Sequence, residues 1–382
     1  VLDEAALQGY GNQGLMEILR QQPSVSLSRN GGPGQTATLR IRGEEGYRTL
    51  TLIDGIRVSD PGSTQIATLP EHLLSQGVSR VEIMRGPQGL SYGADAGGVV
   101  MVQTLLPAMG WQSALDIQTG RFGSQQYAAS VATGGEQGAI AVQLTQLTSD
   151  GFNARSSDVL VQDDDGYRNF SGHLKARYQL SDAVQVDFVH RKTSAATEYD
   201  GCFLASTSDC RTDYSLQATR AGLVYEGAQS RHSFAISRTA SDRDFFTQGT
   251  LGFATEGTLG RAEYLGSTNQ FAGMTLVFGG DVEQVEYAPI ERSNKGVFIE
   301  YLSNTGSAFT VNAGYRFDSN SESGTNTSTR LGAAYLWDSL AWGAVRFKAA
   351  YGSGFRAASP YEISYNAGSY AFPPAAGKAL GM

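Results

Sequence analysis

The chain has 382 residues, of which 41% are hydrophobic, and this length is enough for two domains. No apolar run approaches the roughly 18 residues that a membrane-spanning helix needs. If the protein spans a membrane, it must therefore do so as a β-barrel. The formal net charge of -8, with no basic block anywhere in the sequence, argues against a nucleic-acid partner.

The first section of the chain, residues 1–106, has the pattern of a small α/β domain. Apolar residues recur at helical spacing between Asn12 and Gln22, and Pro23 ends that segment. Within residues 38–42 the alternation of Leu and Ile with Arg predicts a strand with one buried face. Further expected elements are a short helix that begins at Pro70 and strands at 78–84 and 98–104.

Residues 81–100 join an alternating strand to a glycine-rich turn and then to a second strand. Val81 and Ile83 alternate with polar neighbours, and Gly86-Pro87 can end the strand because Pro lacks the backbone donor of a ladder. The glycines that follow allow backbone torsions that a Cβ would resist. The pattern therefore predicts a corner between two strands and no helix.

Two sets of residues could suggest catalysis or metal binding. Ser91 lies in a G-x-S-x-G pattern, but a nucleophile elbow needs a helix after the serine, and a Gly-rich strand follows here. We therefore expect a turn at Ser91 and no enzymatic activity. The four histidines have neither HExxH nor paired-ligand spacing and are assigned no catalytic or zinc role; they are His72, His173, His190 and His232.

From Trp111 onward the pattern changes to repeated amphipathic strands separated by polar loops. Residues 309–317, for example, alternate apolar and polar side chains with a period of two. We count about thirteen candidate strands of roughly ten residues each, the length that crosses a bilayer obliquely. A soluble secreted β-sandwich would also alternate, but its strands are usually shorter. The sequence therefore predicts a mainly β second domain over residues 107–382.

Three ordered blocks of the first domain resemble the plug domain of TonB-dependent outer-membrane receptors. They are Arg42-Gly43 after residues 38–41, the run from Leu52 to Val58, and Arg85-Gly86-Pro87. The amino-acid sequence of residues 30–35 most resembles that of the cobalamin-transporter branch of this family. The resemblance implies an α/β plug inside the lumen of a transmembrane antiparallel β-barrel. Because such barrels have about twenty-two strands, C-terminal strands and an upstream energy-coupling segment are expected outside this sequence, which also shows no signal peptide.

This family imports scarce, bulky nutrients across the Gram-negative outer membrane. The resemblance implies contact with outer-membrane lipid and lipopolysaccharide, and energy from the TonB-ExbB-ExbD complex. It also implies a corrinoid substrate such as cobalamin. A ferric-siderophore receptor is the main alternative within the class. A plugged barrel that serves surface adhesion or assembly without transport is the alternative from another class.

The resemblance also suggests residues for the substrate site and for plug retention. Substrate contacts are expected on two plug loops and on loop aromatics behind them, namely Arg29, Asn30, Gly31, Gly32, Gly62, Ser63, Thr64, Gln65, Tyr199 and Phe203. Arg42 and Arg85 are expected to pair with barrel-wall carboxylates, a role that suits the bidentate guanidinium fork. The alternative for both arginines is ordinary solvent-facing charge.

An acidic run at Asp163, Asp164 and Asp165 is the one candidate metal site. Three adjacent carboxylates repel one another unless water or a hard cation neutralises them, and calcium prefers such oxygen ligands. In cobalamin transporters an acidic loop in a similar place binds calcium. Asp158, Asp200 and Asp209 are conceivable further ligands, and a solvated loop tip is the alternative.

Cys202 and Cys210 are the only two cysteines and lie in a polar segment. Their spacing does not fit a CxxC metal or redox site. In an oxidising compartment such a pair closes a small loop as a disulfide. The alternative is two free thiols in a reducing compartment.

Overall fold

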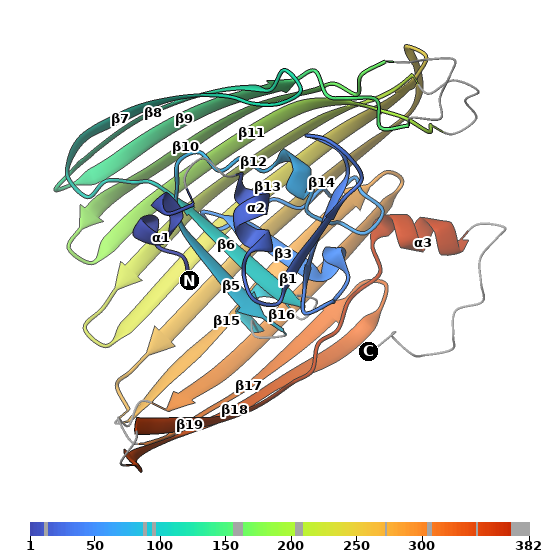
Figure 1. Ribbon diagram of the computed structural model, residues 1–382. Coiled ribbons are helices and arrows are strands. Elements are labelled where there is room, and N and C mark those ends of the chain that lie inside the picture. The colour runs from blue at the N-terminus through green and yellow to red at the C-terminus, as the bar shows by residue number, and fades with distance from the viewer. Residues whose placement is uncertain are drawn as a thin grey trace.

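The computed structural model describes residues 1–10, 14–86, 90–93, 97–155, 163–202, 209–271, 273–303, 308–340 and 343–367. A large curved antiparallel sheet wraps around one side of a smaller N-terminal unit, as Figure 1 shows. We call the N-terminal unit, residues 1–106, the plug, and the large sheet the wall.

The plug combines short helices with two small sheets. Strands β3, β4, β5 and β6 form a sheet in the order β4-β3-β6-β5, in which β3 and β6 are parallel, and β1 and β2 form a separate hairpin. The elements are α1 (Glu4–Gln8), α2 (Leu15–Arg20), β1 (Val25–Arg29), β2 (Ala37–Ile41), η1 (Gly46–Arg48), β3 (Thr49–Ile53), β4 (Ile56–Arg57), η2 (Pro70–His72), β5 (Val78–Arg85), η3 (Leu90–Tyr92) and β6 (Gly98–Thr104). The expected α/β unit is therefore confirmed.

The plug core follows the alternation of apolar and polar residues in the sequence. Leu39 and Ile41 on β2 are buried, whereas Arg40 is half-buried and Arg42 is exposed. The same cluster continues into residues of the wall, among them Leu216 and Ala218. Because apolar side chains of both units share one core, the plug is packed against the wall and not merely placed near it.

In the described residues the wall has thirteen strands in sequential order, each antiparallel to the next. They are β7 (Gly110–Thr119), β8 (Gln125–Gly135), β9 (Gly138–Ser149), β10 (Tyr167–Ser181), β11 (Val184–Tyr199), β12 (Cys210–Glu226), β13 (Ser230–Thr247), β14 (Thr250–Thr268), β15 (Met274–Tyr287), β16 (Ile290–Ser303), β17 (Phe309–Asn320), β18 (Gly324–Leu340) and β19 (Gly343–Gly352). This confirms the expectation of about thirteen strands.

The two ends of the wall differ in their connections. The long intervals between β9 and β10 and between β11 and β12 fall at one end of the wall, which we call the loop end, where the segment that leads to α3 (Pro360–Ala367) also lies. Residues 136–137 and 182–183 make tight turns at the opposite end, which we call the turn end. Such asymmetry is typical of outer-membrane barrels.

The two faces of the wall also differ. Side chains that face the plug include buried charges, such as Arg316, whereas side chains of the opposite parity are apolar and exposed, such as Ile236 and Val297. An apolar outer face and a polar inner face are the pattern of a barrel in lipid. None of the helices in the described part of the chain has the length and hydropathy to cross a membrane.

Candidate functional site

Asp60 joins a plug loop to the wall. Its side chain is buried, forms an ion pair with Arg243 of β13, and accepts a hydrogen bond from the Ser241 hydroxyl at 2.5 Å. The same carboxylate accepts a hydrogen bond from the backbone N–H of Gly62 at 2.9 Å. One side chain therefore holds both the wall and the start of residues 61–65.

Asp54 makes a second contact with the wall. It lies in the tight turn between β3 and β4, and its carboxylate is 2.6 Å from Lys175 Nζ and 2.9 Å from His173 Nε2, both on β10. The Thr104 hydroxyl of the plug also donates to it, at 2.6 Å. Burial alone would raise the pKa of Asp54, but these hydrogen bonds and the Lys175 charge bring it below its ordinary value.

Arg57 makes the third charged contact. Its guanidinium donates to Glu283 Oε2 of β15 at 2.8 Å; Glu283 is buried and Arg57 is half-buried. Arg261 and Arg292, from β14 and β16, also pair with Glu283. A buried carboxylate that several guanidiniums share keeps its charge compensated only while each partner stays in place.

A polar cluster around η2 completes this interface. The Tyr167 hydroxyl of β10 donates to the backbone carbonyl of Glu71 at 3.2 Å and lies 3.0 Å from His72 Nδ1. Asn169 Nδ2 donates to the His72 carbonyl at 3.3 Å. Burial raises the pKa of the Glu71 carboxyl to about 7 and lowers that of His72 to about 3. Both side chains are thus more stable in their neutral forms than they would be in water.

Between the plug and the loop end of the wall lies a cavity of about 610 Å³. We call it the apical cavity. Residues 36–40, 45–47, 62–65 and 67–70 of the plug line one side of it, and Arg243, Phe245, Phe253, Ala254, Thr255, Tyr287 and Tyr361 line the other. The cavity is therefore built from segments of the chain that are far apart in sequence.

All four of the expected residues from the second plug loop line the apical cavity: Gly62, Ser63, Thr64 and Gln65. The Ser63 hydroxyl donates to the Asp60 carbonyl at 2.7 Å, which fixes the turn. The Ser359 hydroxyl donates to the Thr64 carbonyl at 2.5 Å. The loop is thus held from the plug side and from the segment before α3.

The lining of the apical cavity is mostly neutral. Apart from hydroxyl, amide and apolar groups it contains the aromatic rings of Tyr47, Phe245, Phe253, Tyr287 and Tyr361. Its charged side chains are Arg40, Glu45 and Arg243. The Arg243 charge is compensated by Asp60, and one Arg40 nitrogen donates to the Ser28 hydroxyl at 3.0 Å. This composition suits a large cargo with rings and neutral polar groups.

The other expected substrate contacts lie elsewhere. Residues 29–32, all of them described, are not among those that line the apical cavity. Arg29 Nη2 is 3.4 Å from Glu17 Oε1 at the surface, and Gly32 lies against the Phe152 ring. Tyr199 is the last residue of β11, where it pairs with Cys210, and Phe203 lies outside the described residues.

Arg42 and Arg85 lie together at the turn side of the plug. Both line a second cavity, of about 420 Å³, between the plug and strands β16 to β19. Arg85 Nε donates to the Pro23 carbonyl at 2.9 Å. Within the part of the chain that the structure describes, neither arginine forms an ion pair with a carboxylate. Their expected anchoring role stays a prediction.

The acidic run occupies the long connection before β10. Asp165 is buried and its Oδ2 accepts a hydrogen bond from the Ala154 N–H at 2.8 Å, while Asp163 Oδ1 is buried without a hydrogen-bond partner in the described chain. Asp164 is exposed. Burial, together with Asp200, Asp163 and Glu198, raises the pKa of Asp165 to about 6. These oxygens suit a hard cation, but the described residues contain no group of three or more side chains arranged to hold a metal.

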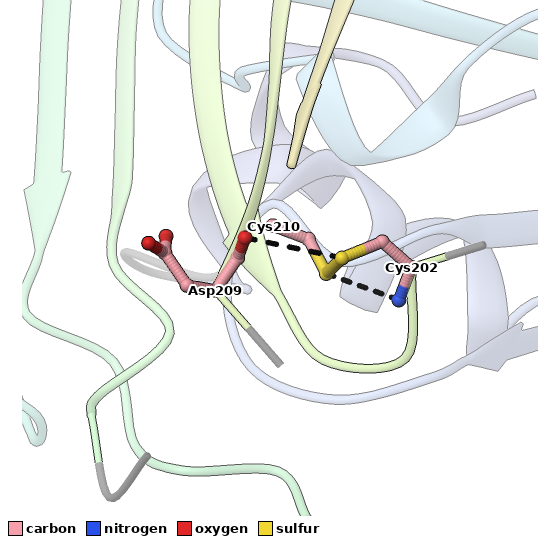
Figure 2. The surroundings of a disulfide bond; sticks show 3 residues. All are labelled: Cys202, Asp209 and Cys210. Atoms are coloured by element: carbon pink, nitrogen blue, oxygen red, sulfur yellow. Dashed lines mark hydrogen bonds between the residues drawn. A yellow bond between two sulfur atoms is a disulfide. The ribbon is translucent and has the colours of Figure 1, made fainter. Parts of the chain in front are cut away.

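Cys202 and Cys210 are joined by a disulfide with a Cα–Cα distance of 5.8 Å, as Figure 2 shows. The Cys202 N–H also contacts Cys210 Sγ at 3.0 Å. The bridge closes the connection between β11 and β12 at the loop end. Ser91, in turn, lies in the short 3₁₀ segment η3, and the next element among the described residues is the strand β6.

The sequence did not single out Asp54, Arg57 and Asp60, although they make the charged contacts between plug and wall. The sequence does contain a sign of this role. Asp54 and Arg57 interrupt the mainly apolar run from Leu50 to Val58, and Asp60 follows it by two residues. Charges inside a run that is otherwise buried need partners. Sequence could indicate that partners exist, but not which strands supply them.

Two family models match the chain. One, described as the TonB-dependent receptor plug domain, matches residues 1–100, and the other, described as the TonB-dependent receptor-like β-barrel, matches residues 108–378. Together they cover both units that the structure shows.

Individual relatives have low sequence identity to this chain. The vitamin B12 transporter BtuB of Photobacterium profundum is 26% identical over 372 residues, which cover 94% of this chain and 59% of the relative. BtuB of Vibrio vulnificus is 24% identical over 381 residues, with the same 94% and 59% coverage. The chain thus spans 59% of the length of these relatives.

Solved structures share the fold. The siderophore receptor PirA from Acinetobacter baumannii superposes with a TM-score of 0.80 at 14% identity, and the match covers 94% of this chain and 61% of that one. At this identity the likeness bears on the fold and not on the cargo.

Proposed function

Because the chain belongs to the TonB-dependent receptor family, we propose that it imports a scarce, bulky nutrient across a Gram-negative outer membrane. Cargo would bind in the apical cavity at the loop end. The TonB-ExbB-ExbD complex would then pull on the N-terminal side of the plug. Leu2 shares two backbone hydrogen bonds with Val81, of 2.7 and 2.8 Å, so such a force would act directly on β5.

The cargo we propose is a corrinoid such as cobalamin. This choice rests on the mostly neutral lining of the apical cavity, which contains five aromatic rings and only three charged side chains, Arg40, Glu45 and the Asp60-paired Arg243. A corrinoid presents a large ring edge and peripheral amide groups, which hydroxyls and aromatic faces can contact. A ferric catecholate siderophore is strongly anionic and would favour unpaired cations at the site. The relatives named as vitamin B12 transporters agree with this choice.

A ferric siderophore is the alternative cargo, and Arg40 at the cavity is the observation in its favour. Titration calorimetry of the purified receptor with cobalamin and with several ferric chelates separates the two. We expect saturable cobalamin binding and weaker binding of the chelates. Binding of a ferric chelate alone would overturn the corrinoid assignment, and binding of neither would favour a non-transporting role.

We also propose that calcium binds at the acidic run, which does not itself line the apical cavity, and that the ordered run favours cargo binding from outside it. Asp163 and Asp165 would supply ligands. Asp163 Oδ1 is buried without a hydrogen-bond partner in the described chain, and the Asp165 carboxyl lies close to other acidic side chains. Linkage then requires calcium to raise cargo affinity, by about 5-fold or more. Replacing Asp163, Asp164 and Asp165 with Asn should remove the calcium dependence and leave calcium-free affinity almost unchanged. Cobalamin affinity that is the same with calcium and with chelator would contradict the proposal.

A further inference from the structure

Four threonine hydroxyls of the apical cavity lining have no hydrogen-bond partner among the described residues, and each hydroxyl oxygen is buried. They belong to Thr49, Thr51, Thr68 and Thr255, which we call the threonine cluster. None of the four is among the substrate contacts expected from the sequence. The cavity is thus lined by four buried polar groups that neither plug retention nor the loop at 62–65 employs.

The alternation along β3 directs two of these hydroxyls toward the cavity. Thr49 and Thr51 are 4% and 1% exposed and lie on one face of the strand. Leu50 and Leu52 occupy the opposite face and pack against Val99. Valine has nearly the same shape as threonine, suits a strand equally well and leaves no hydroxyl unpaired. The two threonines are therefore unfavourable for folding unless a group in the cavity pairs with them.

The other two hydroxyls come from different segments of the chain. Thr68 forms an antiparallel bridge with Ser59 in the plug. Thr255 lies on β14, where it pairs in register with Arg243 of β13. The plug therefore supplies three hydroxyls of the threonine cluster and the wall supplies one. Because Asp60 already compensates the Arg243 charge, that arginine is not available to balance a charge on a bound group.

Thr49 marks the inner end of the apical cavity. Together with Tyr47 and Gln65 it also lines a second cavity, of about 50 Å³, so the two cavities are adjacent. Arg57 and Glu283, which pair between the plug and the wall, line this smaller cavity as well. A space of that size does not admit a ring system. Only a side group of a large cargo can therefore extend to the inner part of the threonine cluster.

The hydrogen-bonding capacity of the threonine cluster indicates the type of side group that it binds. Each hydroxyl can donate and accept, and four hydroxyls match a primary amide, which has two N–H donors and two acceptor lone pairs. A carboxylate only accepts, and its charge is costly to bury without an unpaired cation. A methyl ester is neutral but cannot donate. The cluster therefore favours an amide over the corresponding acid or ester.

We propose that the threonine cluster binds one primary amide side group of the cargo and so makes the receptor specific for amide-bearing cargo. The proposal rests on the corrinoid cargo proposed above, whose periphery carries such amides. The ring system would stay in the wider part of the apical cavity, against aromatic side chains such as Phe245 and Phe253. One amide would extend from it between β3 and β14. The four threonines would thus determine specificity without stabilising the fold.

Titration calorimetry of the purified full-length receptor tests the proposal. The probes are cobalamin and its isomeric monomethyl esters, in each of which a methyl ester replaces one peripheral amide. The unmodified receptor should bind one of these esters roughly 10-fold more weakly than cobalamin, because that ester places a group without donors in the threonine cluster. Thr49→Val with Thr51→Val should weaken cobalamin binding roughly 10-fold and remove the preference for cobalamin over that ester. Thr49→Ser with Thr51→Ser keeps both hydroxyls and should retain the preference.

Thermal unfolding of the same samples separates a binding role from a structural one. The double valine variant should unfold at the same temperature as the unmodified receptor or higher, because it loses two unpaired hydroxyls. A lower unfolding temperature with unchanged cobalamin affinity would overturn the proposal and assign the hydroxyls to the fold. Thr145→Val is the matched control, since Thr145 is buried on β9 and does not line the apical cavity; it should change neither affinity nor preference.

The outcomes also separate this proposal from the cargo assignment. If the unmodified receptor binds cobalamin and every ester equally, or if the double valine variant keeps the full affinity and preference, the amide site is rejected and the corrinoid cargo stands. Either result would show that water alone pairs with the four hydroxyls. If the unmodified receptor does not bind cobalamin, the corrinoid assignment is rejected and the amide site with it.

Discussion

Two regions of the plug surface carry charges toward the wall, and they differ in how those charges are paired. In the segment from Asp54 to Asp60, each of the three charged residues has a partner on the wall, from β10, β13 or β15. At the other corner, Arg42 and Arg85 border a cavity beside β16 to β19. Within the described chain no carboxylate pairs with either arginine.

The difference indicates that residues that hold the plug to the wall also shape the apical cavity, where we propose that cargo binds. The paired segment leads directly into residues 61–65, and Asp60 bonds both to the wall and to Gly62. The floor of the apical cavity is therefore set by the same contacts that hold the plug. The arginine corner is on the turn side, so its partners would affect retention without shaping that floor.

Replacing Asp60 with Ala should have the largest effect. It leaves Arg243 half-buried without its partner, and breaking one member of a buried pair costs ~3–5 kcal/mol. Hydrogen exchange across residues 58–69 should accelerate strongly. Asp242→Ala is the control, because Asp242 is adjacent but exposed on the outer face. Equal exchange in the two variants would show that Asp60 does not anchor the loop.

The double substitution Arg42→Ala with Arg85→Ala sharpens the contrast. If both arginines meet buried carboxylates, hydrogen exchange across residues 38–104 should reveal a loss of ~3–5 kcal/mol. If Arg85 makes only its bond to the Pro23 carbonyl, the loss should be about 1.5–3 kcal/mol. Arg20→Ala, at an exposed position, gives the baseline. Protection as high as in that baseline rejects any anchoring role.

The interface around Glu71 should depend on pH in a defined direction. Burial raises the pKa of Glu71 from 4.5 to about 7 in the folded plug, so the protonated form is favoured. The contribution of Glu71 to the stability of the folded plug is therefore fully present below about pH 4.5 and is lost as pH rises through about 7. The free energy of unfolding changes by roughly 3 kcal/mol or less over this range. Exchange of the amides near Ala37 and Leu73, corrected for intrinsic rates, should be slower at pH 5 than at pH 8. Glu71→Gln should flatten this dependence, and an unchanged slope in that variant would assign it to another group.

Local pattern determined what the sequence could predict. The alternation at Leu39 and Ile41 identified the buried face of β2, and period-two runs such as 309–317 identified wall strands. Strand lengths were underestimated, since β13 has 18 residues where about ten were expected. The expectation counted only the residues needed to cross lipid, whereas the strands continue past the apolar band toward the loop end.

The sequence could not predict which residues far apart in the chain contact each other. Asp60 and Arg243 are 183 positions apart, and Arg57 and Glu283 are 226 apart. Which strand meets which plug residue depends on the register of every hairpin between them. The loop at 62–65 could be suggested from resemblance, but the aromatic wall of its cavity comes from Phe245, Tyr287 and Tyr361, on separate segments.

The most direct test of the account compares cargo affinity when a bulky side chain is placed on each of the two plug loops. Thr64→Trp projects into the apical cavity, and Asn30→Trp alters an exposed position that does not line it. By titration calorimetry with cobalamin, Thr64→Trp should weaken binding roughly 10- to 100-fold, since overfilling a packed site costs ~1–3 kcal/mol. Asn30→Trp should leave the affinity almost unchanged. Weakened binding in Asn30→Trp with normal binding in Thr64→Trp would contradict the assignment of the apical cavity as the cargo site.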